Sequence, residues 1–132
     1  MSSTAWYTRS TWSAADADDF WARIARKRHP EMRAQLIRIQ AEYLEKAGHL
    51  DAAIKLLEQV LAQYPENFDI AQVHHQLATC RERQGRIVDS IHHLRAALAA
   101  QKTKPNYRTG AWLTFGRIVA EHRLLELYPE FL

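Results

Sequence analysis

The stretch Lys46–Asn67, KAGHLDAAIKLLEQVLAQYPEN, determines how this chain is expected to fold. Gly48 supplies a tight reversal after a preceding helix, because glycine adopts left-handed backbone without steric cost. Leu57 and Leu61 lie four residues apart in a leucine-rich stripe, a spacing that places side chains on one face of a helix. Pro65 then disfavours helical backbone in the residue before it. The stretch therefore predicts the turn and the second helix of a helical hairpin.

The same pattern recurs 37 residues further along the chain. Residues 45–61, EKAGHLDAAIKLLEQVL, align with residues 82–98, ERQGRIVDSIHHLRAAL, so that Gly48 corresponds to Gly85. A single helical hairpin cannot bury its apolar face, whereas stacked neighbours can, so the two copies predict stacked units. The corresponding small or apolar residues are Ala41 with Ala78, Leu50 with Ile87, Ala53 with Ser90, Ile54 with Ile91, Leu57 with Leu94 and Leu61 with Leu98.

The rest of the chain also carries helix signals. Ser13 can cap a helix with Asp16 three residues on, in the manner of a capping box. Ala41 and Ala53 have no bulk, which lets the two helices of the first unit approach closely. No segment alternates convincingly as a strand does. We therefore predict an all-α fold, with helices over about residues 13–29, 31–47, 51–64, 68–84, 87–101 and 107–127.

Length and composition are those of one globular domain. The chain has 132 residues, of which 47% are hydrophobic and 25% charged, with a formal net charge of +3. The single cysteine, Cys80, cannot form an internal disulfide. The N-terminal residues lack the apolar core of a secretory signal, and no apolar run approaches the ~18 residues of a membrane span. These features lead us to expect a cytoplasmic protein that does not enter a membrane.

The repeated pattern resembles the tetratricopeptide repeat, a 34-residue helix–turn–helix unit with small residues at fixed positions and a closing proline. The resemblance covers about residues 33–128, in two units and a half unit that begins at AWLTFG, residues 111–116. The second unit departs from the family pattern, with His74 at the tryptophan-type position and Arg81 at the tyrosine-type position. Its closing proline, Pro105, is displaced by three additional loop residues relative to Pro65.

The resemblance implies a domain organisation as well as a fold, namely a short solenoid of antiparallel helix pairs. We expect the helix around Phe20, Trp21 and Ile24 to cap the first unit and the last helix to close the other end. The predicted segments are an aromatic arm at 1–12 and a single domain at 13–132, divided into a capping helix at 13–30, repeats at 31–67 and 68–105, and a half repeat with a cap at 106–132.

In tetratricopeptide folds the first helices of successive units line a concave surface that holds an extended peptide or a partner helix. The resemblance therefore implies a groove that binds another protein or peptide. Glu42 and Gly110 stand where carboxylate-binding members have a clamp asparagine and a clamp lysine, which argues against that subset. The implied groove residues are Gln35, Arg38, Glu42, Glu45 and Lys46 from the first unit, Gln72, His75, Thr79, Glu82 and Arg83 from the second, and Leu113, Arg117 and Glu121 from the half unit.

The sequence gives little support for catalysis or metal binding. Adjacent helical residues point about 100° apart, so neither the pair at 74–75 nor the pair at 92–93 of the seven histidines forms a local two-ligand site. Ligands converging from separate helices are the alternative that this reasoning leaves open. Glu42, Glu45 and Glu82 could share one face, but helical glutamates are usually solvated, and no phosphate loop or serine elbow is present. We predict no catalytic residue, no cofactor and no metal.

The densest basic stretch, ARIARKRHPEMR at residues 22–33, supplies a second functional hypothesis. Arg23, Arg26, Lys27 and Arg28 could follow the phosphates of a nucleic acid. The same charges are also favourable at the C-terminus of a helix, where they offset the helix dipole. We therefore favour a protein-binding module, such as an adaptor, an assembly factor, or a chaperone-like or neutralising binder, over a nucleic-acid-associated protein.

The aromatic arm makes a separate prediction. Trp6, Tyr7 and Trp12 would form an aggregation-prone patch if they were exposed together. A tethered segment loses little translational entropy when it packs, so we expect the arm to pack on its own chain and the protein to be a monomer. Packing on a second copy, which would make a homodimer, is the alternative.

Overall fold

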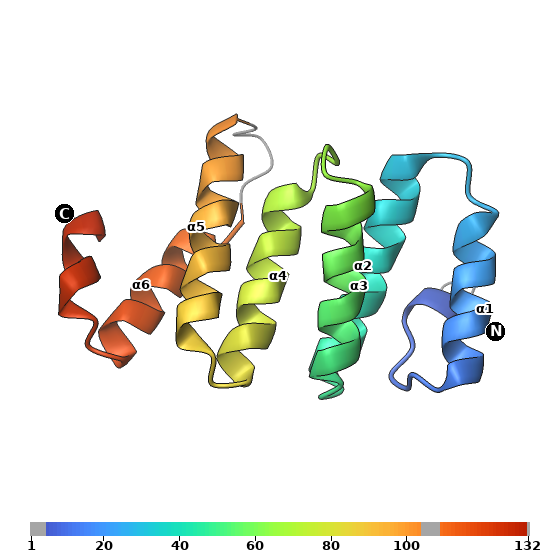
Figure 1. The fold of residues 1–132 in the computed structure, drawn as a ribbon, viewed down its shortest axis with the longest axis horizontal. Coiled ribbons are helices and arrows are strands. Elements are labelled where there is room, and N and C mark those ends of the chain that lie inside the picture. The colour runs from blue at the N-terminus through green and yellow to red at the C-terminus, as the bar shows by residue number, and fades with distance from the viewer. Residues whose placement is uncertain (1–4, 104–108, 132) are drawn as a thin grey trace.

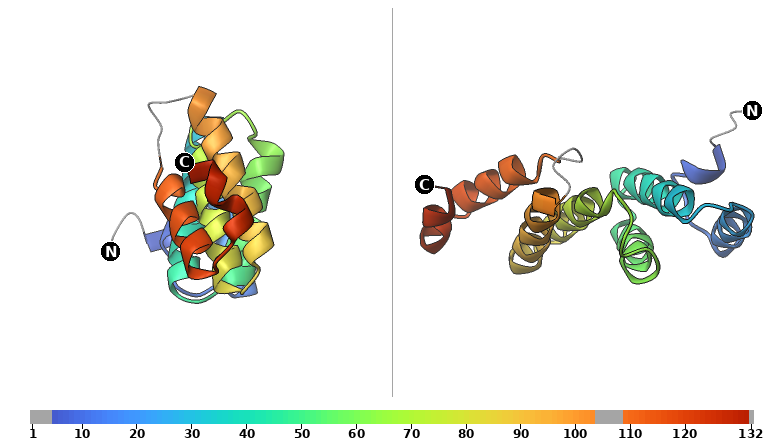
Figure 2. Two further views of the ribbon diagram at one scale, coloured as in Figure 1. Left: turned by 90° about the vertical axis from the view of Figure 1, so that its left-hand side faces the viewer. Right: turned by 90° about the horizontal axis from the view of Figure 1, so that it is seen from above.

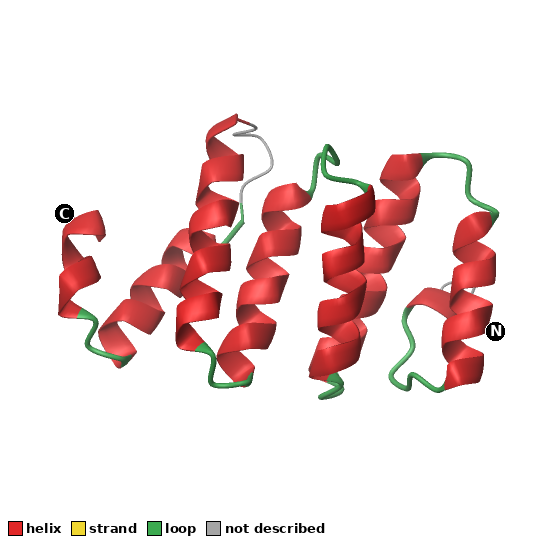
Figure 3. Ribbon diagram, in the orientation of Figure 1, coloured by secondary structure: helices red, strands yellow, loops and turns green. Residues whose placement is uncertain are grey.

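The structure of the chain, a computed structural model, describes residues 5–103 and 109–131. Within these residues all regular elements are helices and none is a strand, which confirms the all-α prediction (Figure 3). The elements are the short 3₁₀ helix η1 (Ala5–Tyr7), the α-helices α1 (Ala14–Ala25), α2 (Pro30–Lys46), α3 (Leu50–Gln63), α4 (Ile70–Arg83), α5 (Ile87–Thr103) and α6 (Ala111–Glu121), and the 3₁₀ helix η2 (Leu125–Phe131).

The helices form antiparallel pairs stacked along the long axis of the molecule. The pair α2–α3 is followed by α4–α5 and then by α6 with η2, from the N-terminal to the C-terminal end (Figure 1). Seen from above, α2, α4 and α6 lie in one row, and α1, α3 and α5 lie in a second row (Figure 2). This two-layered arrangement confirms the predicted short helical solenoid.

Gly48 and Gly85 form the reversals within the two pairs, as the sequence predicts. Their backbones are left-handed, with φ of +90° and +78°, conformations that an L side chain rarely adopts. In the first turn the His49 N–H donates to the Leu44 carbonyl over 2.8 Å. In the second turn the Arg86 N–H donates to the Arg81 carbonyl over 2.9 Å. These six-residue closures are Schellman motifs, which satisfy the last carbonyls of each helix.

The last predicted helix, 107–127, is wrong at its C-terminal end, because the chain reverses at a third turn. Arg123 takes the left-handed backbone, with φ of +50°, and the Leu124 N–H donates to the Val119 carbonyl over 3.0 Å. This is the same closure as at the two glycines, made without a glycine. The third unit therefore has a turn and a short η2 where a second helix would lie. The predicted start at Tyr107 and the proline Pro105 lie outside the described residues.

The first predicted helix, 13–29, also ends earlier than expected. Its last helical residue is Ala25, and Lys27 and Arg28 lie in the link to α2 rather than in the helix. Pro30 opens α2 at its first position and disfavours helical backbone in the residue before it. The Arg33 guanidinium donates to the Lys27 carbonyl over 2.6 Å, so this backbone carbonyl of the link has a hydrogen-bond partner.

The core runs through the stack as two clusters that meet at α4. Val73, Leu77 and Cys80 of α4 belong to the cluster built with α1, α2 and α3, whereas Ala78 belongs to the cluster built with α5 and α6. All four side chains are buried. Because α4 contributes to both clusters, each unit completes the core of its neighbour.

Residues 5–12 pack on their own chain. Trp6 and Trp12 are partly buried against Phe20 of α1, with ring centroids 5.8 Å and 5.4 Å from it. The backbone of Arg9 is fixed by the buried amide of Gln40 on α2: the Arg9 N–H donates to Oε1 over 3.0 Å, and Nε2 donates to the Arg9 carbonyl over 2.9 Å. Residues 5–12 and α1 together therefore cover the exposed side of the first pair.

Asp16 connects this arm to the start of α1. Its side chain accepts from the Ser13 N–H over 2.9 Å while the Ser13 hydroxyl accepts from the Asp16 N–H, which completes the predicted capping box. The same carboxylate accepts from the Thr11 hydroxyl and pairs with the Arg9 guanidinium at 3.0 Å. These contacts, the Ser13 N–H first, lower the pKa of Asp16 from 3.8 to about 2.

We predict that Ala53→Leu destabilises the protein by roughly 1–3 kcal/mol through overpacking. Ala53 is fully buried in the first core cluster, so additional methyl groups have no space. Ala62→Leu, an exposed position on the same helix, is the matched control and should change stability little. The free energy of unfolding, measured with urea, tests this, and equal effects of the two substitutions would show that Ala53 is not at a close helix contact.

We also predict that Asp16→Asn lowers the melting temperature at pH 7 and that this difference shrinks as the pH falls from about 4 to about 2. A carboxylate whose folded pKa is depressed contributes stability above its unfolded pKa, and that contribution is lost as pH falls through the folded pKa. Asp18→Asn, at an exposed position in the same helix, is the control. A melting difference that stays constant down to pH 2 would contradict an ionic role for Asp16.

Candidate functional site

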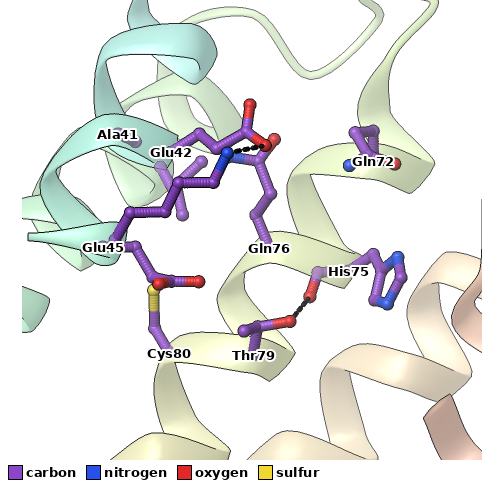
Figure 4. A pocket seen from close by; sticks show the side chains of 10 residues that line it. Ala41, Glu42, Glu45, Gln72, His75, Gln76, Thr79 and Cys80 are labelled. Carbon is purple, nitrogen blue, oxygen red and sulfur yellow. Dashed lines mark hydrogen bonds and ion pairs between the residues drawn. The ribbon is translucent and has the colours of Figure 1, made fainter. Parts of the chain in front are cut away.

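The first helices α2, α4 and α6 form one continuous surface, here called the first-helix face. A pocket of about 130 Å³ opens on it between α2 and α4 (Figure 4). Polar side chains from both helices surround the opening, while a small apolar floor lies below them. The lining residues are Ala41, Glu42, Glu45 and Lys46 of α2, Leu57 of α3, and Gln72, His75, Gln76, Thr79 and Cys80 of α4.

The pocket holds neutral hydrogen-bonding groups more than free charges. Burial lowers the pKa of His75, and its Nε2 lies 2.9 Å from the Thr114 hydroxyl of α6. Burial also raises the pKa of the Cys80 thiol to about 12, so this sulfur stays protonated. Thr79 donates its hydroxyl to the carbonyl of His75 within α4, as Figure 4 shows. The Cys80 thiol is therefore not an activated nucleophile.

Charged side chains pair across the first-helix face from one unit to the next. Glu45 of α2 pairs with Arg83 of α4. Glu82, the residue equivalent to Glu45 in the second unit, accepts two bonds from Arg117 of α6, at 2.7 Å and 2.8 Å. Arg117 lowers the pKa of Glu82 by hydrogen bonding, and Glu82 raises the pKa of Arg117 in return. The same repeat position thus supplies a glutamate–arginine contact at both junctions.

A second contact joins α2 to α4, nearer to the N-terminal end of α2. The Arg38 guanidinium donates to Gln76 Oε1 over 3.1 Å, and Gln76 Nε2 donates to the Arg38 carbonyl over 3.1 Å. Arg38 also lies 3.2 Å from the carboxylate of Asp69 and is largely covered. The residue of the second unit that is equivalent to Arg38 is His75. It contacts the next first helix in the same way, through the Thr114 hydroxyl of α6.

Six of the thirteen predicted groove residues meet at the pocket, namely Glu42, Glu45, Lys46, Gln72, His75 and Thr79. Gln35 is half-buried on α2, and Leu113 on α6 is 78% exposed. The other five, Arg38, Glu82, Arg83, Arg117 and Glu121, are in contacts between helices or within α6. Sequence reasoning missed Gln76, although it lies four residues after Gln72 and three before Thr79, a spacing that places all three on one face.

The glutamates considered for acid–base chemistry all form ion pairs in the structure. Glu45 and Glu82 each pair with an arginine, and Glu42 lies 3.5 Å from Lys46 in a solvent-exposed pair. In the part of the chain that the structure describes, no three histidine, cysteine or carboxylate side chains gather where they could hold a metal ion. None of the described helices has the length and apolar character needed to cross a membrane.

The basic stretch at residues 22–33 is partly engaged with the N-terminal arm. The Arg23 guanidinium and the Lys27 ammonium lie 5.9 Å and 5.6 Å from the centre of the Trp6 ring, within range of a cation–π contact. Arg23 also pairs with Asp19 at 3.0 Å. Arg26 and Arg28 are exposed.

Comparison with protein-family models gives a match. A family model described as tetratricopeptide repeat matches residues 44–111, a little more than half of the chain. The matched segment begins at the end of α2 and ends at the first residue of α6, so it includes the α4 side of the pocket. Comparisons with curated proteins and with solved structures gave no match.

We predict that Glu82→Gln lowers the free energy of unfolding by about 0.5–1 kcal/mol, the range of a well-formed surface ion pair, and that added salt reduces the effect. The substitution keeps the size of the side chain but removes the charge that Arg117 contacts. Glu42→Gln, which affects only the long contact with Lys46, is the control. Urea unfolding at low and high salt measures both, and a salt-independent loss would show that the charge pair is not the cause.

Proposed function

The chain belongs to the tetratricopeptide repeat family, and from this premise we propose that it is a non-enzymatic module that binds another protein through the first-helix face. Modules of this family generally mediate protein–protein interaction. The observation that carries the proposal for this chain is the polar pocket between α2 and α4, on the face that three successive first helices share. A cytoplasmic adaptor, assembly factor, or chaperone-like or neutralising binder would use such a face.

The chemistry of the face fits an extended peptide or a helix better than a small charged ligand. The amide of Gln72 and the hydroxyl oxygen of Thr79, which can still accept, match the N–H and C=O groups of a peptide backbone. The charges beside them are compensated by contacts between units, so they exert little net attraction on an ion of either sign. At the α6 end, Leu113 is 78% exposed and offers an apolar contact.

A role without catalysis is supported by the state of the reactive groups. The Cys80 thiol is buried and protonated, and Glu45 and Glu82 are held by arginines. A general base or nucleophile needs a free, suitably tuned group within reach of a substrate. The engagement of residues 5–12 with their own chain supports a monomer as the binding form.

Binding of a nucleic acid through the basic stretch ranks second. Lys27 is half-buried beside Trp6, and Arg23, although exposed, lies against the same ring and pairs with Asp19. Arg26 and Arg28 are exposed as well, and so few arginines would give weak, salt-sensitive attraction to phosphates. Capture of nucleic acid that is lost in Arg26→Ala/Arg28→Ala, and is retained when the pocket is blocked, would favour this alternative.

The test is an affinity capture from the native cell with a blocked pocket. The variant Gln72→Arg/Thr79→Arg places two long cationic side chains in the pocket and should abolish capture of the partner protein. The control, Ala62→Arg/Ala99→Arg, adds the same charge at exposed positions on α3 and α5, in the opposite row, and should capture normally. Far-UV dichroism establishes that both variants fold. A partner retained by the pocket variant and lost by the control would overturn the proposal.

A further inference from the structure

Two histidines converge from separate helices in the second unit, away from the first-helix pocket. His74 lies on α4 and His93 on α5, and their Nδ1 atoms are 3.2 Å apart. The rings are stacked, with centroids 5.4 Å apart and an angle of 30° between their planes. Both side chains are half-buried, so the pair is held by the helix packing and is still reachable from solvent.

The first unit provides an internal comparison for this pair. Thirty-seven residues earlier, the equivalent positions are Ile37 on α2 and Leu56 on α3, which are 0% and 3% exposed in the core. The second unit thus has two imidazoles at positions where the first unit has two apolar side chains. Burying polar rings costs free energy unless their nitrogens find partners, and in this pair the two Nδ1 atoms are partners of each other.

The distance between the two nitrogens suits a shared metal ion. Zn²⁺ binds histidine nitrogen at about 2.0–2.1 Å, and an angle of about 90–110° at the metal places two such nitrogens roughly 2.9–3.4 Å apart. The observed 3.2 Å lies within this interval. Without a metal, one Nδ1 carries the hydrogen that joins the pair. Coordination through both Nδ1 atoms requires this hydrogen to move to Nε2 of the same ring and the two rings to turn, so that both lone pairs point at the ion rather than at each other.

We propose that His74 and His93 form a two-histidine site for a divalent transition-metal ion such as Zn²⁺, with water completing the coordination. Imidazole is a preferred ligand of these ions. The ring of His92, an exposed neighbour, lies edge-on to His93 with centroids 5.3 Å apart and is not counted as a ligand. With two protein ligands the site should bind weakly, and the bound ion should link α4 to α5 and stabilise the second unit.

The ionisation of the pair agrees with this assignment. Burial lowers the pKa of His74, and burial together with the neighbouring histidines lowers that of His93 to about 4. Both rings are therefore neutral at pH 7, the form in which imidazole binds metals. The positive charge of Arg81, which acts on His93, opposes a bound ion, whereas the negative charge of Asp89 favours it. Together these charges again suggest weak binding.

The experiment titrates zinc chloride into the full-length chain after treatment with a chelator, using calorimetry and thermal melting. Wild type should bind one Zn²⁺ per chain and melt at a higher temperature with zinc than without it. His74→Ala and His93→Ala should each weaken binding by at least about tenfold and remove the zinc-dependent shift. His49→Ala, at an exposed position before α3 with no side-chain capping bond, should behave like wild type.

A second variant keeps the test decisive if the alanine variants fold poorly. His74→Ile/His93→Leu reproduces the pair found in the first unit, so it should fold, melt at a higher temperature than wild type without zinc, and show no further rise with zinc. The proposal is overturned if this double variant binds zinc as wild type does. It is equally overturned if zinc neither binds wild type nor shifts its melting temperature.

Discussion

The structure depends on one packing constraint: the apolar face of a helix pair cannot be covered by the pair itself. In this chain α4 covers the apolar faces on both of its sides. Its residues Val73, Leu77 and Cys80 complete the core of the first unit, and Ala78 joins the second core cluster. The close approach within the first pair depends on Ala41 and Ala53, both fully buried. Any change that separates one pair therefore also exposes the apolar face of its neighbour.

The same constraint explains the two ends of the stack. At the N-terminal end the buried Gln40 stands at the position where the second unit has Leu77, and its amide bonds the backbone of Arg9 instead of packing on a preceding helix. An aromatic cluster around Phe20 supplies the apolar cover there. At the other end Leu124 and Leu127 pack on the second core cluster from the turn and η2, which supply a shorter cover than a full second helix.

The parts of the fold that follow from local chemistry could be predicted from the sequence. Gly48 and Gly85 mark their turns because few other residues accept the backbone found there, and the capping box at Ser13 is a short-range signal. The turn at Arg123 has the same geometry without a glycine, so composition gave no sign of it. The exact position of residues 5–12 could not be predicted from the sequence. It depends on one side-chain amide, that of Gln40, which binds the backbone of Arg9.

The candidate site was predictable as a set of positions but not as a set of interactions. Helical periodicity and the family resemblance place Glu45 and Glu82 on the groove face, yet their arginine partners lie 38 and 35 residues away and depend on how adjacent units are offset. The pairing of His74 with His93 likewise depends on the register between α4 and α5. Of these contacts, the Glu45–Arg83 pair joins α2 to α4, the two helices between which the pocket opens. The shape presented to a partner is therefore a property of the stacking, so a substitution at a helix junction can alter binding without touching the partner.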